Sequence, residues 1–314
     1  MLIDTSTLPK DEQTFLELQQ LFEKNGYALY KMRKFEEYSL YQEYRNFLGS
    51  ESVLTFQGFG GKLMALKPDV TLSIVKNAKM GMSAPEKLYY RESVYRTERG
   101  GSEFREINQM GLECIGRFGS DTVLEICGLA MESLATIDDD FIFAVSHMGF
   151  VTGLMDECGI DNPVSKKAVL ELLRSRNAHD VASVGGVSAR AAEKIAALAS
   201  GSTEFPAALE LARSLSEGRE TESALTELNA LYGKVSGTCF SEKIRLDFSV
   251  LNDIDYYNGM IFQGYVKRVP KLILSGGRYD GLLARTGKEL CAMGFALSLG
   301  ELNACYPRRV QKEE

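Results

Sequence analysis

The sequence has few histidines, no paired cysteine motif and no excess of positive charge. Its two histidines, His147 and His179, cannot form a histidine-rich metal site, and none of the six cysteines belongs to a Cys-x-x-Cys pair. Four cysteines lie in apolar runs, which favours buried free thiols in a reducing compartment over disulfides. Lys and Arg number 36 against 43 Asp and Glu, a net charge of −7. This balance argues against a protein that mainly grips phosphate backbones.

Long hydrophobic runs are also missing. No stretch reaches the roughly 18 apolar residues of a membrane helix, and the most apolar segment, 141–155, is interrupted by Ser146, His147 and Thr152. The first residues show no basic region followed by an apolar one, so we expect no signal peptide. We therefore predict a cytoplasmic protein with no membrane span, no metal site and no cofactor.

The periodicity of apolar residues predicts an α+β fold. Helical spacing over 12–25 is followed by Gly26, a residue suited to a helix C-terminus. Strand-like runs return after a long Ala/Leu-rich helical stretch, which implies a helical insertion between two parts of one core. Strands are predicted at 53–56, 63–66, 87–97, 107–116, 141–146, 244–250, 261–266, 272–274 and 291–297. The predicted segments are 1–162, 163–233 (helical insertion) and 234–314.

Two polar motifs follow strands in the first segment. Asp69 and Thr71 come after the strand that ends near residue 66, and Arg96, Thr97 and Glu98 come where the strand 87–97 ends. Asp69 and Thr71 would by themselves fit an ordinary helix N-terminus. The second group would fit a solvated ion-pair surface. Together they can also line a binding site.

A third motif lies within the strand 107–116. Gln109, Gly111 and Glu113 share one face by the two-residue period of a strand. A carboxylate and an amide beside apolar neighbours fit either a wet outer face or a ligand-binding face.

Two further motifs lie near the end of the chain. The run 255–259, Asp-Tyr-Tyr-Asn-Gly, is typical of a hairpin turn with exposed aromatics. The run 275–281, Ser-Gly-Gly-Arg-Tyr-Asp-Gly, favours a tight turn, although its glycines would also allow a ligand to approach the backbone.

The order of these five motifs resembles that in the catalytic domain of histidyl-tRNA synthetases, over residues 12 to about 302. Asp-Tyr-Tyr-Asn at 255–258 resembles the second histidine signature, which is specific to this family among class II aminoacyl-tRNA synthetases. The resemblance implies a class II-like, mostly antiparallel sheet of about six or seven strands, flanked by helices and carrying the helical insertion.

Two positions depart from the synthetase pattern. Asn252 stands where the synthetases have a catalytic arginine, and Glu301 stands where their third class II motif has the arginine that grips ATP. Amino-acid activation needs preorganised cations around a triphosphate, and losing one such group costs on the order of 10²–10³ in rate. The chain is also expected to lack an anticodon-binding domain, because it ends at Glu314. We therefore predict that the activation chemistry is lost.

The groups suited to holding an amino acid remain. From the resemblance, Arg96 would bind the α-carboxylate. The ammonium would be held by Asp69, Thr71 and Gln109. The two imidazole nitrogens would be bound by Glu113 and Tyr257. The predicted histidine-binding site consists of Asp69, Thr71, Arg96, Gln109, Glu113, Tyr256 and Tyr257.

A chain that keeps the amino-acid-binding residues and lacks both activating arginines is similar to the regulatory subunits of ATP phosphoribosyltransferase. These subunits are paralogues of histidyl-tRNA synthetases. The resemblance implies a non-catalytic subunit, required for the first step of histidine biosynthesis and sensing histidine for feedback inhibition. It also implies a homodimer of this chain and a hetero-octamer with the short-form catalytic subunit. Two alternatives remain open: a residual amino-acid-activating enzyme, and a tRNA-binding or tRNA-mimic sensor, against which the acidic balance weighs.

Overall fold

The computed structural model describes residues 7–43, 53–78, 84–97, 103–251, 257–285 and 287–307. Eight strands of this part of the chain form one central sheet. They are β1 (Ala28–Leu29), β5 (Glu86–Thr97), β6 (Phe104–Gly116), β7 (Phe141–His147), β8 (Ile244–Leu246), β9 (Met260–Val266), β10 (Leu274–Arg278) and β11 (Cys291–Ser298).

The central sheet has the strand order β1-β5-β6-β11-β10-β9-β7-β8. Neighbouring strands are antiparallel except at the two edges, where β1 pairs with β5 and β7 with β8 in parallel. The predicted α+β class and the mostly antiparallel sheet are confirmed. The expected number of six or seven strands was wrong, because β1 is only two residues long and leaves no alternating pattern.

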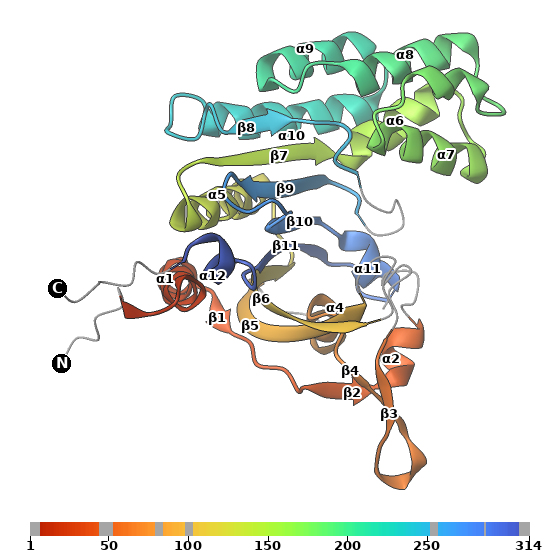
Figure 1. Cartoon of the computed structure of the whole chain (residues 1–314). Helices are drawn as coiled ribbons and strands as arrows, with labels where there is room; N and C mark the ends of the chain where they lie inside the picture. The colour runs from red at the N-terminus through yellow and green to blue at the C-terminus, as the bar shows by residue number, and fades with distance from the viewer. Residues whose placement is uncertain are drawn as a thin grey trace.

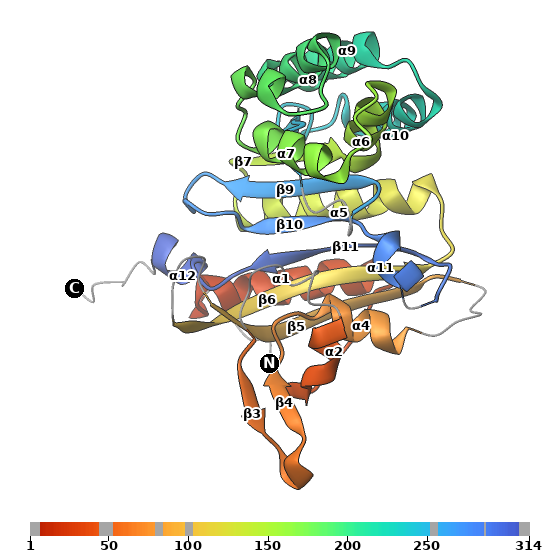
Figure 2. The same cartoon turned by 90° about the vertical axis from the view of Figure 1, so that its right-hand side faces the viewer.

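Helices α1 (Lys10–Lys24) and α5 (Ser120–Ile137) cover one face of the sheet, behind the strands in Figure 2. Buried residues of α1 recur three and four apart, at Phe15, Leu18 and Phe22. This spacing places them on one side of the helix, against the sheet. Gly26, with φ +81°, follows the helix in the left-handed conformation that glycine favours, as predicted.

The opposite face carries a second, separate hydrophobic cluster near β5 and β6. Helices α4 (Thr71–Asn77) and α11 (Asp280–Arg285) contribute to it, together with Tyr90, Ile115 and Tyr279. The alternation of side chains along β5 and β6 separates the two clusters, since Tyr89 and Leu112 belong to the cluster under α1 and α5. Both faces of these strands are therefore partly covered, which makes any polar residue on them informative.

A small three-stranded sheet projects from the β5 end of the molecule (Figure 1). Its order is β2-β4-β3, with antiparallel pairing throughout. The elements are β2 (Phe35–Glu37), α2 (Tyr38–Glu43), β3 (Thr55–Gln57), the 3₁₀ turn η2 (Phe59–Gly61) and β4 (Leu63–Leu66). The strands predicted at 53–56 and 63–66 correspond to β3 and β4, which pair with each other.

The helical region stands at the β7 end of the sheet (Figure 1). It contains α6 (Met148–Glu157), α7 (Pro163–Arg174), the 3₁₀ turn η3 (His179–Ser183), α8 (Ala189–Ser200), α9 (Phe205–Leu215) and α10 (Arg219–Val235). The short helix α12 (Leu302–Cys305) follows β11 and lies beside α1 (Figure 1). Residues 163–233 are helical in character, as predicted. Their buried side chains join the core under α1 and α5 rather than forming a core of their own. The proposed domain boundaries stay a prediction.

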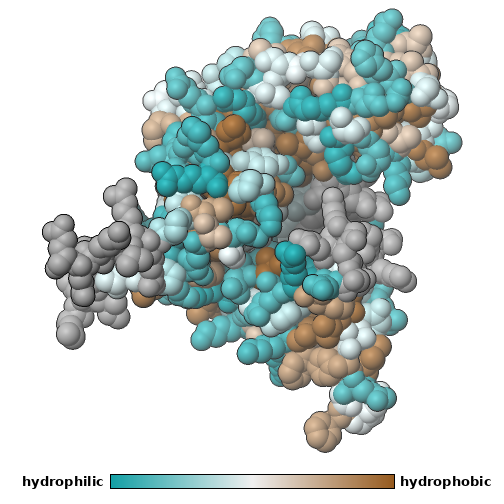
Figure 3. Space-filling model, in the orientation of Figure 1, coloured by the Kyte–Doolittle hydropathy of each residue, from teal (hydrophilic) through white to brown (hydrophobic). Residues whose placement is uncertain are grey.

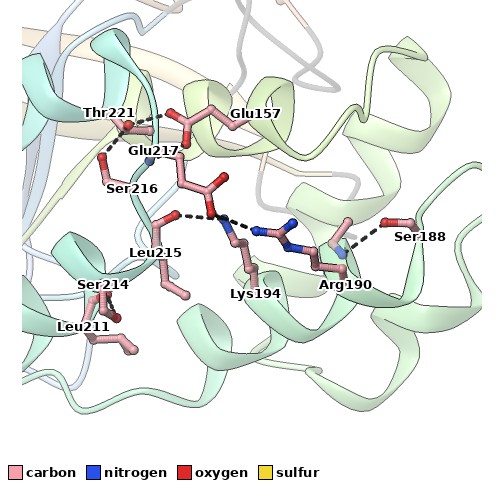
Figure 4. Close-up of polar contacts among 11 residues, drawn as sticks. Glu157, Ser188, Arg190, Lys194, Leu211, Ser214, Leu215, Ser216, Glu217 and Thr221 are labelled. Carbon is pink, nitrogen blue, oxygen red and sulfur yellow. Dashed lines mark hydrogen bonds and ion pairs between the residues drawn. The ribbon is translucent and has the colours of Figure 1, made fainter.

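Polar contacts hold the helical region together (Figure 4). The Glu157 carboxylate, at the end of α6, accepts a hydrogen bond from the Glu217 backbone N–H at 2.8 Å and one from the buried Thr221 hydroxyl. Glu217 in turn binds Lys194 at 2.7 Å and Arg190 at 3.0 Å, both on α8. Glu157 thus ties the end of α6 to the segment that leads into α10 and to the first turn of that helix.

Two local predictions were wrong. The strand predicted over 244–250 ends at Leu246, because the backbone turns, with the Val250 N–H donating to the Asp247 carbonyl. Gly276 and Gly277 lie inside β10 rather than in a tight turn. They are strand residues because β9 and β11 pair with them on both sides.

All six cysteines are free, as predicted. Cys114 and Cys127 are buried, whereas Cys239 is exposed. Within the described ranges, no helix has the length and apolar character needed to cross a membrane.

Candidate functional site

One face of the central strands carries unusually small side chains. The pairing of strands places Glu113 of β6 beside Gly294 of β11, and Gly294 beside Gly277 of β10. The next row along the same strands consists of Gly111, Ala296 and Ser275. Large apolar residues occupy the other face and form the main core. Small residues on a strand allow another group to approach the backbone closely.

Glu113 is the most buried acidic residue of this face, with 2 % exposure. Its Oε1 accepts a hydrogen bond from the Thr71 hydroxyl at 2.7 Å, and its Oε2 accepts one from the Tyr279 hydroxyl. Burial raises the pKa of Glu113 to about 8, although the two hydroxyl donors oppose this shift. The alternative of a wet outer face is therefore wrong for Glu113.

Asp69 and Arg96 form an ion pair next to this carboxylate. Asp69 Oδ1 accepts from the Leu72 N–H at 2.8 Å at the start of α4, and Oδ2 lies 3.2 Å from Arg96 Nη2. Arg96 also donates to the Pro68 carbonyl. Burial raises the pKa of Asp69, and the positive charge of Arg96 limits the rise. Asp69 therefore binds a backbone N–H at the start of α4 and also contacts Arg96 of the predicted site.

Gln109 is buried on the same face of β6, two rows from Glu113. Its neighbours across the ladder are Glu92 on β5 and Ser298 on β11. Glu92 forms an ion pair with Lys67, whose side chain is almost fully buried. Lys67 and Glu92 were not predicted as site residues. The only sequence signal for Lys67 was its position beside Pro68 and Asp69.

Tyrosines form the side of the site next to Gly277. The rings of Tyr257 and Tyr279 meet edge to face, with centroids 6.5 Å apart. The Tyr257 ring lies so close to Gly277 that a Cβ there would come within 2.8 Å of it. Tyr279 was missed as a site residue, although it lies within the glycine-rich motif 275–281. Its role becomes visible only through its hydrogen bond to Glu113.

Three predicted positions do not belong to this group of contacting residues. Tyr256 and Asn252 lie outside the described residues. Glu301 is described and exposed, and its carboxylate binds Lys271 Nζ at 2.6 Å. That contact, together with nearby Arg105, lowers the pKa of Glu301.

The structure brings Asp69, Thr71, Arg96 and Glu113 together around the N-terminus of α4. It adds Tyr279 and places Gln109 farther along β6. This arrangement offers a buried carboxylate between hydroxyl donors, aromatic rings and a guanidinium close by. Such a set can recognise a small ligand that carries N–H groups and a carboxylate of its own. Among the described residues, no cluster of His, Cys, Asp and Glu is suited to a metal ion.

The fold is that of the class II aminoacyl-tRNA synthetases. A chain of the ATP phosphoribosyl transferase (HisG:HisZ) complex from Thermotoga maritima matches it with a TM-score of 0.70 at 18% identity, covering 92% of this chain and 97% of that one. A family model described as histidyl-tRNA synthetase matches residues 6–302. The chain belongs to the histidyl-tRNA synthetase family.

Within this family, the chain is similar to proteins with two different names. It is 31% identical over 255 residues to an ATP phosphoribosyltransferase regulatory subunit from Moorella thermoacetica, covering 77% of this chain and 64% of that relative. It is 28% identical over 285 residues to a histidine–tRNA ligase from Methanocaldococcus jannaschii, covering 89% and 68%. The chain therefore spans about two thirds of the length of these curated relatives.

Proposed function

We propose that this chain is the non-catalytic regulatory subunit of an ATP phosphoribosyltransferase and that its buried site senses histidine. The similarity to the Moorella thermoacetica regulatory subunit supports this assignment. The Thermotoga maritima complex adds support, because the match extends over 97% of a chain in that assembly.

The observation that carries the proposal is the contrast between binding and activating positions. Glu113, Asp69 and Gln109 are all buried, and a buried polar group is costly unless it is satisfied. By contrast, Glu301 places a negative charge where ATP activation requires a positive one. A site that keeps amino-acid recognition and loses the triphosphate partner suits sensing rather than catalysis.

In the proposed complex, histidine lies along β6. Its imidazole N–H contacts Glu113, with Tyr257 on the opposite side. Arg96 has five N–H donors, so it can retain its bond to Asp69 while it binds the ligand carboxylate. Asp69 and Gln109 then accept from the ammonium. Tyr256 belongs to the proposal from the sequence alone.

The proposed assembly contains the short-form catalytic subunit, with homodimers of this chain inside a hetero-octamer in the cytoplasm. Histidine regulates it only if histidine binds two states of the complex with different affinity. A coupling free energy of about 1–3 kcal/mol is typical of such regulation.

The test mixes the full chain with a short-form catalytic subunit. We expect a larger particle in sedimentation velocity and phosphoribosyltransferase activity that histidine inhibits. In the Glu113→Gln variant, an amide replaces a carboxyl group that can ionise when it accepts from the imidazole N–H. Inhibition should therefore weaken at least tenfold, while assembly and uninhibited activity stay unchanged. No association at micromolar concentrations would contradict the proposed function. Normal inhibition of the variant by histidine would show that histidine is sensed at a different site.

A second candidate is residual amino-acid activation, favoured by the similarity to the Methanocaldococcus jannaschii ligase. Histidine-dependent exchange of pyrophosphate into ATP distinguishes the two functions. The regulatory proposal expects background exchange by the chain alone.

A further inference from the structure

The two tyrosines that line the site next to Gly277 both lie outside the regular strands. Tyr257 precedes β9, whose pairing with β10 on this side ends where Ile261 meets Gly277. Tyr279 follows directly after the last residue of β10. The hydrogen-bond ladder of the sheet therefore does not fix the position of either ring, and other contacts have to do so.

The three residues that precede β9 each contact the end of β10. The Tyr257 ring lies over Gly277, where a Cβ would come within 2.8 Å of it. The Asn258 N–H donates to the Arg278 carbonyl at 3.2 Å. Gly259 packs against the Arg278 side chain, since a Cβ at Gly259 would lie 2.9 Å from Arg278 Cδ. Any shift at the end of β10 therefore also shifts Tyr257.

Asp280 connects these residues to a third strand. Its Oδ2 accepts from Arg278 Nε at 2.9 Å and from Asn258 Nδ2 at 3.2 Å. Its Oδ1 accepts from the Ala292 N–H of β11 at 2.8 Å. The Asp280 N–H donates in return to Asn258 Oδ1 at 3.2 Å. One half-buried carboxylate thus joins the residues before β9, the end of β10 and the start of β11.

The same contacts hold Tyr279, which lies between Arg278 and Asp280 in the chain. The Tyr279 N–H donates to the Ala292 carbonyl at 2.8 Å, so residues 279 and 280 bind both backbone polar groups of Ala292. From this position the Tyr279 hydroxyl donates to Glu113. The backbone on both sides of the tyrosine is therefore tied to β11 through Asp280.

Helix α11, which begins at Asp280, is anchored on its apolar side. Leu282 and Leu283 pack in the cluster that contains Leu40 and Tyr41 of α2. The small sheet lies on this side of α11 (Figure 1), and Figure 3 shows hydrophobic side chains gathered over it. Packing thus holds the helix, whereas the carboxylate of its first residue connects the helix to the two tyrosines.

We propose that Asp280 is a positioning residue of the histidine site, which holds Tyr257 and Tyr279 in place beside Glu113 without contacting the ligand. This inference rests on the proposed function, because it names a residue on which histidine binding at that site depends.

The first experiment titrates the full chain with histidine in a calorimeter. Asp280→Asn keeps an acceptor for the Ala292 N–H but turns an amide N–H₂ toward Arg278 and Asn258, which are themselves donors. Histidine affinity should fall about tenfold, the equivalent of roughly one hydrogen bond. Asn258→Asp in the same chain restores a pair of one amide and one carboxylate. This reciprocal exchange should return the affinity to within about threefold of wild type.

The matched control is Asp247→Asn, beyond β7 at the other end of the sheet. Asp247 also accepts from a backbone N–H, that of Ser249 at 2.9 Å, and binds an arginine, Arg176, at 2.6 Å. Its side chain is 19 % exposed, against 20 % for Asp280. Asp247→Asn should lose a similar amount of stability in urea and bind histidine like wild type.

Double-mutant cycles separate positioning from a general loss of stability. The effects of Asp280→Asn and Tyr257→Phe on histidine affinity should not add, because a displaced Tyr257 has already lost its contact with the ligand. The effects of Asp280→Asn and Gln109→Ala should add to within about twofold. Hydrogen exchange without histidine gives a second measurement: the amides of Asn258 and Tyr279 should exchange faster in Asp280→Asn and not in Asp247→Asn.

Equal histidine affinity in wild type and Asp280→Asn would overturn the inference and leave the proposed function intact. Equal losses of affinity in Asp280→Asn and Asp247→Asn, or additive effects with Tyr257→Phe, would also overturn it. If Asp280→Asn does not fold, Asn258→Asp alone serves, since it sets two carboxylates against each other; normal affinity in that variant contradicts the inference. No binding by wild type would overturn the proposed histidine site and this inference with it.

Discussion

Glu113 and Glu301 are both carboxylates of the region that resembles a synthetase active site, and they occupy opposite environments. Glu113 is buried between the hydroxyls of Thr71 and Tyr279, and burial raises its pKa to about 8. Glu301 is exposed, and its contact with Lys271 lowers its pKa. Placing Glu113 in its site therefore costs folding free energy, whereas Glu301 costs little.

This difference separates a position that requires its residue type from one that tolerates many. A carboxylate that is kept buried needs partners and room, and α4, β10 and β11 supply both. An exposed carboxylate in a surface ion pair needs neither. The proposed function assigns ligand recognition to the Glu113 end and lost triphosphate binding to the Glu301 end.

The largest effect is expected from Gly294→Ala. A Cβ at Gly294 would lie 1.8 Å from Glu113 Oε2 and 2.3 Å from the Leu112 carbonyl oxygen. The carboxylate must therefore move, and we expect histidine affinity to fall at least 100-fold and the free energy of unfolding to fall by about 1–3 kcal/mol. Calorimetric titration and urea unfolding measure these changes.

Gly300→Ala is the matched control, since a Cβ at Gly300 meets no atom within 4 Å. It should bind histidine like wild type. Equal affinity in the Gly294→Ala variant would mean that the position of Glu113 does not matter for binding.

The pH dependence of the free energy of unfolding tests the raised pKa of buried Glu113. Because the pKa of Glu113 is about 8 in the folded state and 4.5 is its ordinary value, the folded protein holds an extra proton between these limits. The free energy of unfolding should therefore fall as pH rises, by about 3 kcal/mol between pH 6 and pH 9. In the Glu113→Gln variant, this fall in the free energy of unfolding should be absent. The contribution of Asp69, whose pKa is also raised, cancels in the difference between the two proteins. Parallel curves would show that Glu113 is ionised throughout.

Thr71→Val removes one of the two hydroxyl donors to Glu113 and keeps the side-chain shape. The pKa of Glu113 should rise further, because the Thr71 hydroxyl lowers it. The loss of a buried hydrogen bond should decrease the free energy of unfolding by about 1–2 kcal/mol in urea titrations. Thr226→Val, at an exposed site where the hydroxyl donates to the Glu222 carbonyl, should have little effect. A similar loss in both variants would point to helix propensity rather than to Glu113.

The smallest effect is expected at Glu301. Glu301→Arg breaks an exposed ion pair with Lys271, so the free energy of unfolding should change by less than about 0.5 kcal/mol. Pyrophosphate exchange with histidine should stay at background, because Asn252 still replaces the second arginine. Clear exchange by this variant would mean that a single charge blocks an otherwise intact ATP site.

Much of the fold and part of the site could be predicted from local pattern. The period of β6 placed Gln109 and Glu113 on one face, and the structure confirms that both are buried there. Their assignment to histidine stays a prediction. Tyr279 was missed because its contact with Glu113 joins residues 166 positions apart. No local pattern encodes such a pair.

The sequence by itself determined which residues alternate along each strand and where α1 ends. It also placed Asn252 and Glu301 at the two positions predicted to have lost the activating arginines. These features depend on neighbours in the chain, where periodicity and glycine conformation act directly. The tertiary structure decided that the glycines of β10 lie within a strand, that Gly294 makes room for Glu113, and that Lys67 meets Glu92. These features depend on the register between distant strands, and register follows from packing the whole sheet rather than from any one segment.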